Sequence, residues 1–166
     1  MTRPALAGLR VLECGQMVSA AYATKLLADL GAEVIKVEPP EGDASRRRGP
    51  FPRGEAHPER SGLFLYLNTN KRSVRLDLDT ADGRTAFDAL ARRADLFVHN
   101  LAPRSLDAAG LAYERLAAAN PRLVMTSITP FGSSGPRRDD EATALTLWNA
   151  GGIAYLNGSP EAEELP

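Results

Sequence analysis

Cysteine and histidine are nearly absent from this sequence. Cys14 is its single cysteine, and His57 and His99 are its two histidines, so neither residue type provides a disulfide framework or a metal-ligand set. The sequence also has no run of 18 apolar residues, which argues against a membrane-spanning helix. Residues 1–10 lack the apolar core of a signal peptide. We therefore expect a cytoplasmic protein that binds no metal.

An excess of charge of one sign is also lacking. Lysine and arginine together number 20 against 21 aspartates and glutamates, and the formal net charge is −1. This balance argues against nucleic acid and against a membrane surface as partners. Hydrophobic residues make up 43% of the 166 residues, which is enough to bury the core of one ordinary domain.

Two nucleotide-binding motifs are missing as well. The sequence has neither the GxGxxG pattern of a dinucleotide site nor the GxxxxGK[ST] pattern of a P-loop. The segment after the first apolar run reads Gly-Gln-Met-Val-Ser at 15–19 and precedes a predicted helix. Such a turn can offer backbone N–H groups to an anion or an oxyanion, or it can be a plain connection between a strand and a helix.

What the sequence does contain is a regular alternation of short apolar runs and amphipathic segments. The apolar runs predict strands at 9–14, 33–38, 74–78, 96–98 and 123–128. The amphipathic segments predict helices from 19 and from 80, and at 103–109, 113–119 and 141–148. Residues 61–68 fit either a short helix or a strand. The order predicts an α/β fold with a Rossmann-like, doubly wound and mostly parallel sheet over 1–158, followed by an acidic terminal loop at 159–166.

The first predicted helix and the loop after the second strand carry specific expectations. Ser19 is placed to cap the helix, and its apolar face is expected to comprise Ala23, Leu26, Leu27 and Leu30. The loop at 39–60 contains the basic run 46–48, which is either solvated or functional. Loops of this length inside a domain are usually functional or covered by a partner.

Candidate binding residues gather beyond the carboxyl ends of the predicted strands, where doubly wound sheets bind ligands. Asn100 can read an adenine edge, and Arg104 can stack on a base or pair with a phosphate. The alternative is a turn asparagine and a solvated arginine. The basic pairs at 71–72 and 137–138 are either phosphate clamps or solvated groups.

Two blocks are specific enough to suggest a family: LADLGAEVIKVEPP at 27–40 and NKRSV at 70–74. Weaker blocks lie at 9–13, at Gly42, Asp43 and Arg46, and at 76–78, 94–95, 110–111, 120–124 and 131–136. Together these blocks span about residues 8–158 and resemble the class III CoA-transferase family, which includes formyl-CoA transferase and α-methylacyl-CoA racemase.

The resemblance implies the N-terminal portion of a Rossmann-like large domain. It implies transfer of CoA from an acyl-CoA thioester to a carboxylic acid, with CoA or acyl-CoA as the substrate. In that chemistry an aspartate attacks the thioester, and the freed CoA thiolate then forms an enzyme thioester that the acceptor acid displaces. The alternatives are the racemase reaction and a non-catalytic CoA-binding or scaffold remnant.

The resemblance also implies which residues lie along CoA. Met17, Val18 and Ser19 would lie beside the thiol arm. Asn100 and Leu101 would border the adenine.

Charged groups complete the implied site. Arg104 would lie near the adenine, and Lys71, Arg72 and Arg137 would approach the phosphates. The nucleophilic aspartate of the family is expected beyond Pro166, so we expect the isolated chain to be inactive. We expect its partner to be a complementary C-terminal portion or a second subunit, in an interlocked homodimer or a hetero-oligomer.

Overall fold

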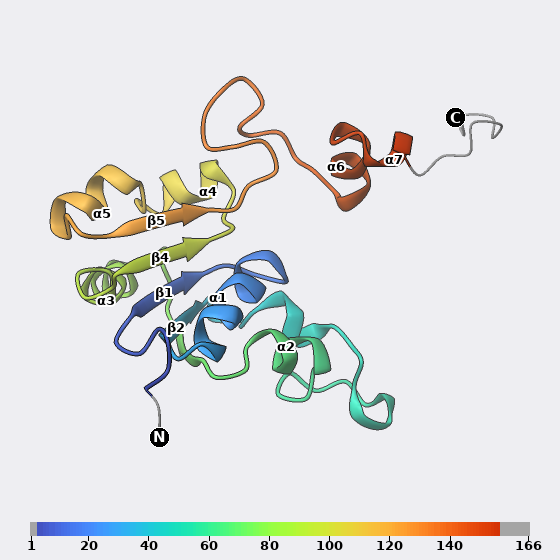
Figure 1. Ribbon diagram of the computed structural model, residues 1–166, viewed down its shortest axis with the longest axis horizontal. Helices are drawn as coiled ribbons and strands as arrows, with labels where there is room; N and C mark the ends of the chain where they lie inside the picture. Colours follow the sequence, from blue (N-terminus) through green and yellow to red (C-terminus); the bar gives the residue numbers. More distant parts are fainter. Residues whose placement is uncertain (1–2, 157–166) are drawn as a thin grey trace. The chain divides into compact units, whose positions relative to one another are not determined.

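The computed structural model describes residues 3–156, and a five-stranded parallel sheet lies at its centre (Figure 1). The strands are β1 (Arg10–Cys14), β2 (Glu33–Glu38), β3 (Arg72–Arg75), β4 (Leu96–His99) and β5 (Val124–Ser127). They lie in the order β3-β2-β1-β4-β5, and each neighbouring pair is parallel. The chain adds β2 and β3 on one side of β1 and then β4 and β5 on the other, so the order reverses between β1 and β4. The predicted doubly wound α/β sheet is confirmed.

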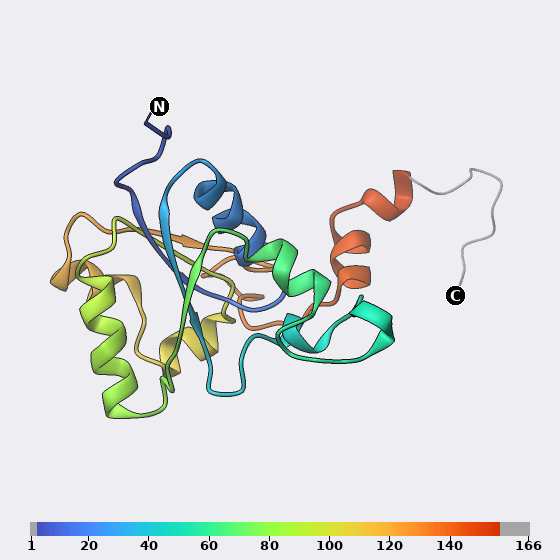
Figure 2. The same ribbon diagram turned by 90° about the horizontal axis from the view of Figure 1, so that it is seen from below.

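Helices cover both faces of this sheet (Figure 2). They are α1 (Ser19–Asp29) on one face and α3 (Ala81–Ala91), α4 (Pro103–Ala108) and α5 (Tyr113–Ala119) on the other. The connection from β2 to β3 contains α2 (Gly62–Leu67) and the short 3-10 helices η1 (Ala44–Arg47) and η2 (Pro52–Gly54). Neighbouring β1 residues Val11 and Leu12 belong to different hydrophobic clusters, because successive side chains of a strand point to opposite faces. The Val11 cluster includes residues of α1. The Leu12 cluster includes residues of α3, α4 and α5, and in it the Phe87 ring meets the Phe97 ring edge-on at 5.4 Å.

The expectation for the first helix is wrong in two respects. The N-cap of α1 is Val18, and no side chain caps the helix, so Ser19 is its first residue rather than its cap. The buried face consists of small residues and one threonine: Ala20, Ala21, Thr24 and Ala28. The predicted core residues Leu26 and Leu30 are exposed instead. Small side chains let α1 lie close to the sheet above the polar groups that are buried there.

Other elements differ from the predictions mainly at their boundaries. Residues 61–68 form the helix α2, because the Ser61 hydroxyl caps it by accepting a hydrogen bond from Phe64 N at 3.1 Å. The strand β3 begins before the predicted segment 74–78 and ends within it. Helix α6 (Ala144–Ala150) begins later than the predicted residue 141, because Thr143 caps it through a capping box with Thr146. Helix α7 (Ile153–Leu156) was not predicted.

The chain divides into two compact units, Met1–Thr129 and Pro130–Pro166. The first contains the whole sheet, and α6 and α7 belong to the second. The predicted portion 1–158 extends past this division and stays a prediction. The predicted terminal loop at 159–166 lies outside the described residues.

Gly83 provides a test of how closely α3 approaches the segment before it. A Cβ atom at this position would lie 1.8 Å from the Asp77 backbone oxygen. In an exposed helix interior, Gly→Ala stabilises by about 1 kcal/mol. We expect Gly83→Ala to destabilise the protein by about 2 kcal/mol, because the backbone must shift. Urea unfolding measures the change, and Ala89→Gly on the exposed side of α3 is the control for propensity alone. A gain in stability for Gly83→Ala would contradict the close approach.

Candidate functional site

A pocket of about 340 Å3 opens at the carboxyl ends of the strands, around the point between β1 and β4 where the strand order reverses. Its lining comes from the ends of β1 and β2 and from the segments that follow β3 and β4: Cys14, Gly15, Gln16, Val37, Pro39, Pro40, Glu41, Leu76, Asp77, Leu78, Asp79 and Leu101. Doubly wound sheets bind ligands outside the carboxyl ends of their strands, where the strand order reverses. This pocket is therefore the candidate binding site.

The connection between β1 and α1, residues 15–18, borders this pocket and is called the first turn below. Asn100, directly after β4, bonds to it from one side. Its Oδ1 accepts from Gln16 N at 2.9 Å, and its Nδ2 donates to Gln16 O at 2.7 Å and to Ser19 Oγ at 2.9 Å. Because β1 and β4 are neighbours, these hydrogen bonds bridge the reversal point of the sheet.

Asp43, in the loop after β2, bonds to the first turn from the other side. Its Oδ1 accepts from Met17 N at 3.1 Å and from Ser45 N and Oγ at 2.7 Å each. Its Oδ2 forms an ion pair with Lys36 Nζ at 2.7 Å. In the same loop, Ala44 N donates to Gln16 Oε1 at 3.2 Å. The first turn is thus fixed by two loops that come from opposite sides of β1.

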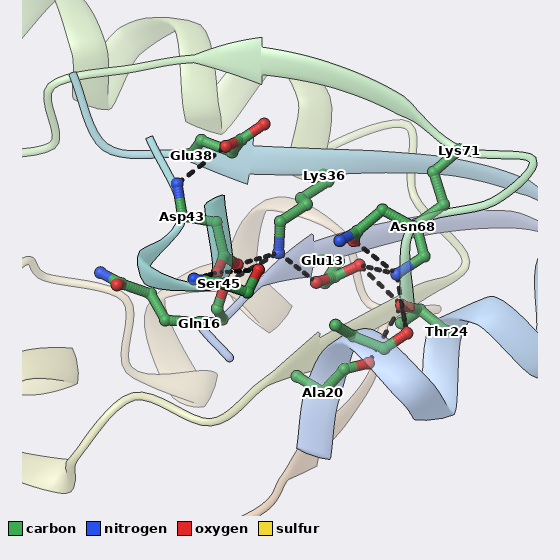
Figure 3. Close-up of polar contacts among 12 residues, drawn as sticks. Glu13, Gln16, Ala20, Thr24, Lys36, Glu38, Asp43, Ser45, Asn68 and Lys71 are labelled. Carbon is green, nitrogen blue, oxygen red and sulfur yellow. Dashed lines mark hydrogen bonds and ion pairs between the residues drawn. The ribbon is translucent and has the colours of Figure 1, made fainter. Parts of the chain in front are cut away.

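Beneath the first turn lies a buried network of two carboxylates and two ammonium groups, shown in Figure 3. Lys36, which is 1% exposed, donates from Nζ to Glu13 Oε1 at 2.7 Å and to Gly15 O at 3.0 Å, besides its ion pair with Asp43. Thr24 on α1 donates its hydroxyl to Glu13 Oε2 at 2.6 Å. The single ammonium group of Lys36 therefore links the middle of the sheet to the first turn and to the next loop.

Lys71 is the second cation of this network. Its Nζ donates to Glu13 Oε2 at 2.8 Å, to Ala21 O at 2.7 Å and to Asn68 Oδ1 at 3.0 Å. An ammonium group has three N–H donors, so all of them are used within the protein. Burial lowers the pKa of Lys71, and the opposing attraction of Glu13 only partly offsets this.

The charges in the network hold one another ionised. Burial alone would lower the pKa of Lys36, but Glu13 and Asp43 outweigh burial and raise it. Burial alone would raise the pKa of Asp43, but Lys36 and the hydrogen bonds from Ser45 outweigh burial and lower it. Removal of one partner would leave an unpaired charge inside the protein, which costs about 3–5 kcal/mol.

A second buried ion pair fixes the loop at 39–60. Arg46 donates from Nε to Glu38 Oε2 at 2.7 Å and from Nη2 to Glu38 Oε1 at 2.8 Å, and its guanidinium lies 3.6 Å from the centroid of the Phe64 ring. Of the basic run 46–48, Arg46 is thus a buried structural residue, whereas Arg47 and Arg48 are exposed. Glu38 is fully occupied by Arg46, Ser73 and the Asp43 backbone N–H.

The structure brings five of the predicted binding residues together at the pocket and the first turn: Met17, Val18, Ser19, Asn100 and Leu101. Leu101 lines the pocket, and Met17 and Val18 belong to the first turn. Ser19, the first residue of α1, is exposed and tied to Asn100. Arg104 is exposed at the second residue of α4, three residues after Leu101. It makes no ion pair with the described residues. The role of each in binding stays a prediction.

The other predicted residues are placed differently. Lys71 is buried in the network, with no N–H left for a phosphate. Arg72 begins β3, pairs with Glu33 at 3.2 Å and lines a separate pocket of about 290 Å3 with residues from the amino ends of β1 and β2. Arg137 belongs to the second unit, where it pairs with Asp140 at 2.9 Å. The geometry therefore lends no support to a phosphate contact by Lys71 or Arg72.

Two potentially reactive residues at the strand ends are buried. Burial raises the pKa of the Cys14 thiol to about 12 and lowers the pKa of His99 to about 4. Both groups are therefore neutral near pH 7. His99 Nε2 lies 2.7 Å from Ser127 Oγ, and its ring stacks on Phe97.

Residues 3–156 contain neither a cluster of metal ligands nor a membrane-spanning helix. Histidine, cysteine and carboxylate groups do not gather in threes there to hold a metal. No helix in this range is long and apolar enough to span a membrane.

The network of Glu13, Lys36 and Asp43 was missed as a site feature in the sequence. The available signal was the presence of charged residues inside strands that otherwise read as buried, at Glu13, Lys36 and Glu38. Buried charges must be paired, so each of them indicates a partner elsewhere in the chain. The sequence alone does not say which partner, because the pairs join residues up to 58 positions apart.

Comparison with known proteins agrees with this architecture. Residues 6–165 match CoA-transferase family III. The chain is 43% identical over 137 residues to succinyl-CoA:(R)-benzylsuccinate CoA-transferase subunit BbsE of Thauera aromatica, which covers 82% of this chain and 33% of that protein. It is 39% identical over 158 residues to the succinyl-CoA–L-malate CoA-transferase beta subunit of Chloroflexus aurantiacus, covering 94% of this chain and 38% of that subunit.

A solved structure is similar over nearly the whole chain. The crystal structure of a CaiB/BaiF family protein from Brucella suis superposes with a TM-score of 0.87 at 37% identity, over 99% of this chain and 44% of that one. The chain belongs to CoA-transferase family III. It spans about a third to two fifths of the length of the curated relatives named above.

The buried Glu38 carboxylate predicts a loss of stability in acid. Burial alone would raise its pKa, but the hydrogen bonds from Arg46, Ser73 and the Asp43 backbone lower it from 4.5 to about 2. The folded state therefore binds the proton less readily than the unfolded chain. The resulting stabilisation, about 3 kcal/mol at most, is present above pH 4.5 and is lost as the pH falls toward 2.

Urea unfolding at several pH values checks this window. Glu38→Gln should flatten the decline of the unfolding free energy between pH 4.5 and 2. Ser73→Ala, a milder change that removes one hydrogen bond to Glu38, should move the decline to higher pH. The exposed Glu55→Gln is the control. Equal slopes for Glu38→Gln and the unmodified protein would show that another group governs the acid transition.

Proposed function

We propose that this chain is the CoA-binding part of a class III CoA-transferase, which moves CoA from an acyl-CoA thioester to a carboxylic acid. The observation that carries the proposal is the pocket at the reversal point of the sheet, bordered by the first turn and by Leu101. Family membership supports the reaction class. CoA and acyl-CoA are then substrates, no metal takes part in the proposed reaction, and the cytoplasm stays the proposed location.

The charges around the pocket indicate how CoA would lie. Glu41, Asp77 and Asp79 line the pocket and would repel phosphates beside them. Arg104 follows the lining residue Leu101 by three positions, so we place the phosphates toward Arg104 and the adenine against Leu101. The pantetheine arm would then run past the first turn, where Met17, Val18 and Ser19 lie before the N-terminus of α1 and at its start. Backbone N–H groups at that end suit a developing negative charge on a thioester oxygen.

In this proposal the chain holds the coenzyme, and a carboxylate from elsewhere attacks the thioester. The fully buried carboxylates of the first unit, Glu13, Glu38 and Asp43, are each paired with a cation, so none of them is a free nucleophile. A carboxylate held in an ion pair is a weaker nucleophile than a free one. The mixed anhydride would form on the external aspartate, and the CoA thiolate would remain bound by this chain.

Exposed apolar side chains support a protein partner that completes the enzyme. Val18, Tyr22, Leu26 and Leu30 recur every four residues along α1 and are 47%, 42%, 46% and 52% exposed. Residues four apart share one face of a helix, so these four form a continuous stripe. We propose that the remainder of the family protein, as a further segment or a second subunit, covers this stripe.

Binding of adenosine 3′,5′-bisphosphate and CoA tests the site. Titration of the 15N-labelled chain should shift the amide signals of the pocket residues and, for CoA alone, of the first turn. Arg104→Ala should weaken binding of both compounds about fivefold, since an exposed ion pair contributes about 1 kcal/mol. The chain alone should show no CoA transfer.

The matched control is Arg60→Ala. Arg60 is also exposed but does not line the pocket, so its loss should leave both affinities unchanged. Signal changes confined to the pocket at the amino ends of the strands, around Arg72 and Arg93, would refute the assignment of the site. Transfer of CoA by the 166-residue chain alone would refute the external carboxylate.

Light scattering tests the stripe on α1. We expect the isolated chain to self-associate, because a contiguous apolar surface in water favours contact with another apolar surface. Leu26→Glu together with Leu30→Glu should reduce association, whereas Glu114→Gln on α5 should not. A monodisperse monomer for the unmodified chain would contradict the proposed covered surface.

A further inference from the structure

The first turn contains a residue in an unusual backbone conformation. Met17 has φ +62°, in the left-handed region that residues other than glycine, asparagine and aspartate rarely adopt. Among the described residues, the other non-glycine cases are Arg53 and Asn70. Arg53 lies in an exposed loop, and asparagine tolerates this region. Met17 is the one at the pocket, and such strain persists only where the surroundings enforce it.

Two side chains hold the chain around it: Asn100 bonds to Gln16 before Met17 and to Ser19 after it, and Asp43 accepts from the Met17 N–H. Asn100 bonds to both backbone groups of Gln16: its Oδ1 accepts from the N–H at 2.9 Å, and its Nδ2 donates to the C=O at 2.7 Å. The next N–H, that of Met17, bonds to Asp43 Oδ1 at 3.1 Å. The conformation of two consecutive peptide groups is therefore fixed from both loops.

Gly15 shows how close this contact is. A Cβ atom at Gly15 would lie 2.5 Å from Asn100 Oδ1 and 2.7 Å from Ala20 Cβ. Gly15 itself does not have a positive φ, so the glycine is required by the approach of Asn100 rather than by backbone freedom. The turn and the Asn100 side chain fit each other only in this arrangement.

The hydrogen-bonding groups of Asn100 are used within the protein. Its two N–H donors go to Gln16 O and Ser19 Oγ, and its oxygen accepts from Gln16 N. Both N–H donors are therefore occupied, and a direct contact to adenine that keeps these bonds is limited to the second lone pair of Oδ1. Because Asn100 donates to Ser19 Oγ, the Ser19 hydroxyl keeps its own proton for donation to an oxygen of a ligand.

We propose that Asn100 and Asp43 are positioning residues that hold Met17 in the left-handed conformation and aim the Ser19 hydroxyl and the N-terminus of α1 at the thioester end of CoA. The inference rests on the proposed function, which places that end of CoA at the first turn. Asn100 then contributes to binding through the turn and not through the base. Asp43 keeps its orientation through the buried ion pair with Lys36.

A glycine rescue separates positioning from direct contact. Asn100→Ala is introduced into two backgrounds, Met17→Ala and Met17→Gly, which both lack the methionine side chain. Glycine adopts a positive φ without strain, whereas alanine does not. We expect Asn100→Ala to weaken CoA binding about tenfold in the alanine background and less than about threefold in the glycine background. Binding of adenosine 3′,5′-bisphosphate should change in neither.

Asn120→Ala is the matched control. Asn120 also makes three hydrogen bonds to the protein, to Ala91 O, to Ala94 O and from Arg122 N, but it lies just before β5 at the amino end of that strand. Its loss should affect stability about as much as Asn100→Ala and leave CoA affinity unchanged. Equal losses of CoA affinity in the two Met17 backgrounds, or a loss of adenosine 3′,5′-bisphosphate binding, would show a direct contact and overturn the inference.

Amide hydrogen exchange provides a readout that needs no ligand. The Gln16 and Met17 amides should be protected in the unmodified chain, Asn100→Ala should abolish the protection of Gln16, and Asp43→Ala that of Met17. Rapid exchange of both amides in the unmodified chain would overturn the inference. Failure of the unmodified chain to bind either compound, with both amides protected, would instead overturn the proposed function and leave the positioning of the turn supported.

Discussion

The ammonium group of Lys36 is the interaction on which the site depends. It joins Glu13 in the central strand, the Gly15 carbonyl in the first turn and Asp43 in the loop after β2, all within 3.0 Å. A hydrophobic residue in its place would fill the volume but leave the buried carboxylate of Asp43 without a counter-charge, and Glu13 with Lys71 alone. The ion pairs thus fix the relative positions of two loops that hydrophobic packing alone would leave adjustable. That precision is required in the first turn, because its residue Met17 has a strained backbone.

The sheet and most helices could be predicted because they follow from local patterns. Apolar runs of strand length mark β1, β2, β4 and β5, and the segment from Thr80 to Ala91 carries both a cap and a helical apolar face. The parallel order follows from the alternation of strands and helices. The residues at the strand ends, such as Leu101 and the first turn, could be located for the same reason, because the carboxyl ends of parallel strands share one edge.

The errors arise where a tertiary interaction overrides a local one. In α1 the leucines at 26 and 30 form the stronger apolar face, but the sheet beneath carries Glu13, and only Thr24 and small residues can face it. The sequence predicts Lys71 as either a phosphate ligand or a solvated cation. Its partner Glu13 is 58 residues away, and the same contact turns a predicted phosphate ligand into a structural group. Pairing at such separations depends on the fold and leaves no periodic signal.

The proposed function takes the attacking carboxylate from another part of the protein, and the buried pairs are compatible with this. A nucleophilic carboxylate needs to be accessible and free of strong hydrogen bonds, whereas Glu13, Glu38 and Asp43 are fully buried and each hold a cation. In this unit the buried carboxylates hold the first turn and the loop after β2 in place. In the proposed function, a carboxylate carried on a separate segment would approach the thioester without disturbing these ion pairs. Holding the coenzyme and attacking its thioester would then place opposite demands on a carboxyl group, and separating them in the chain would satisfy both.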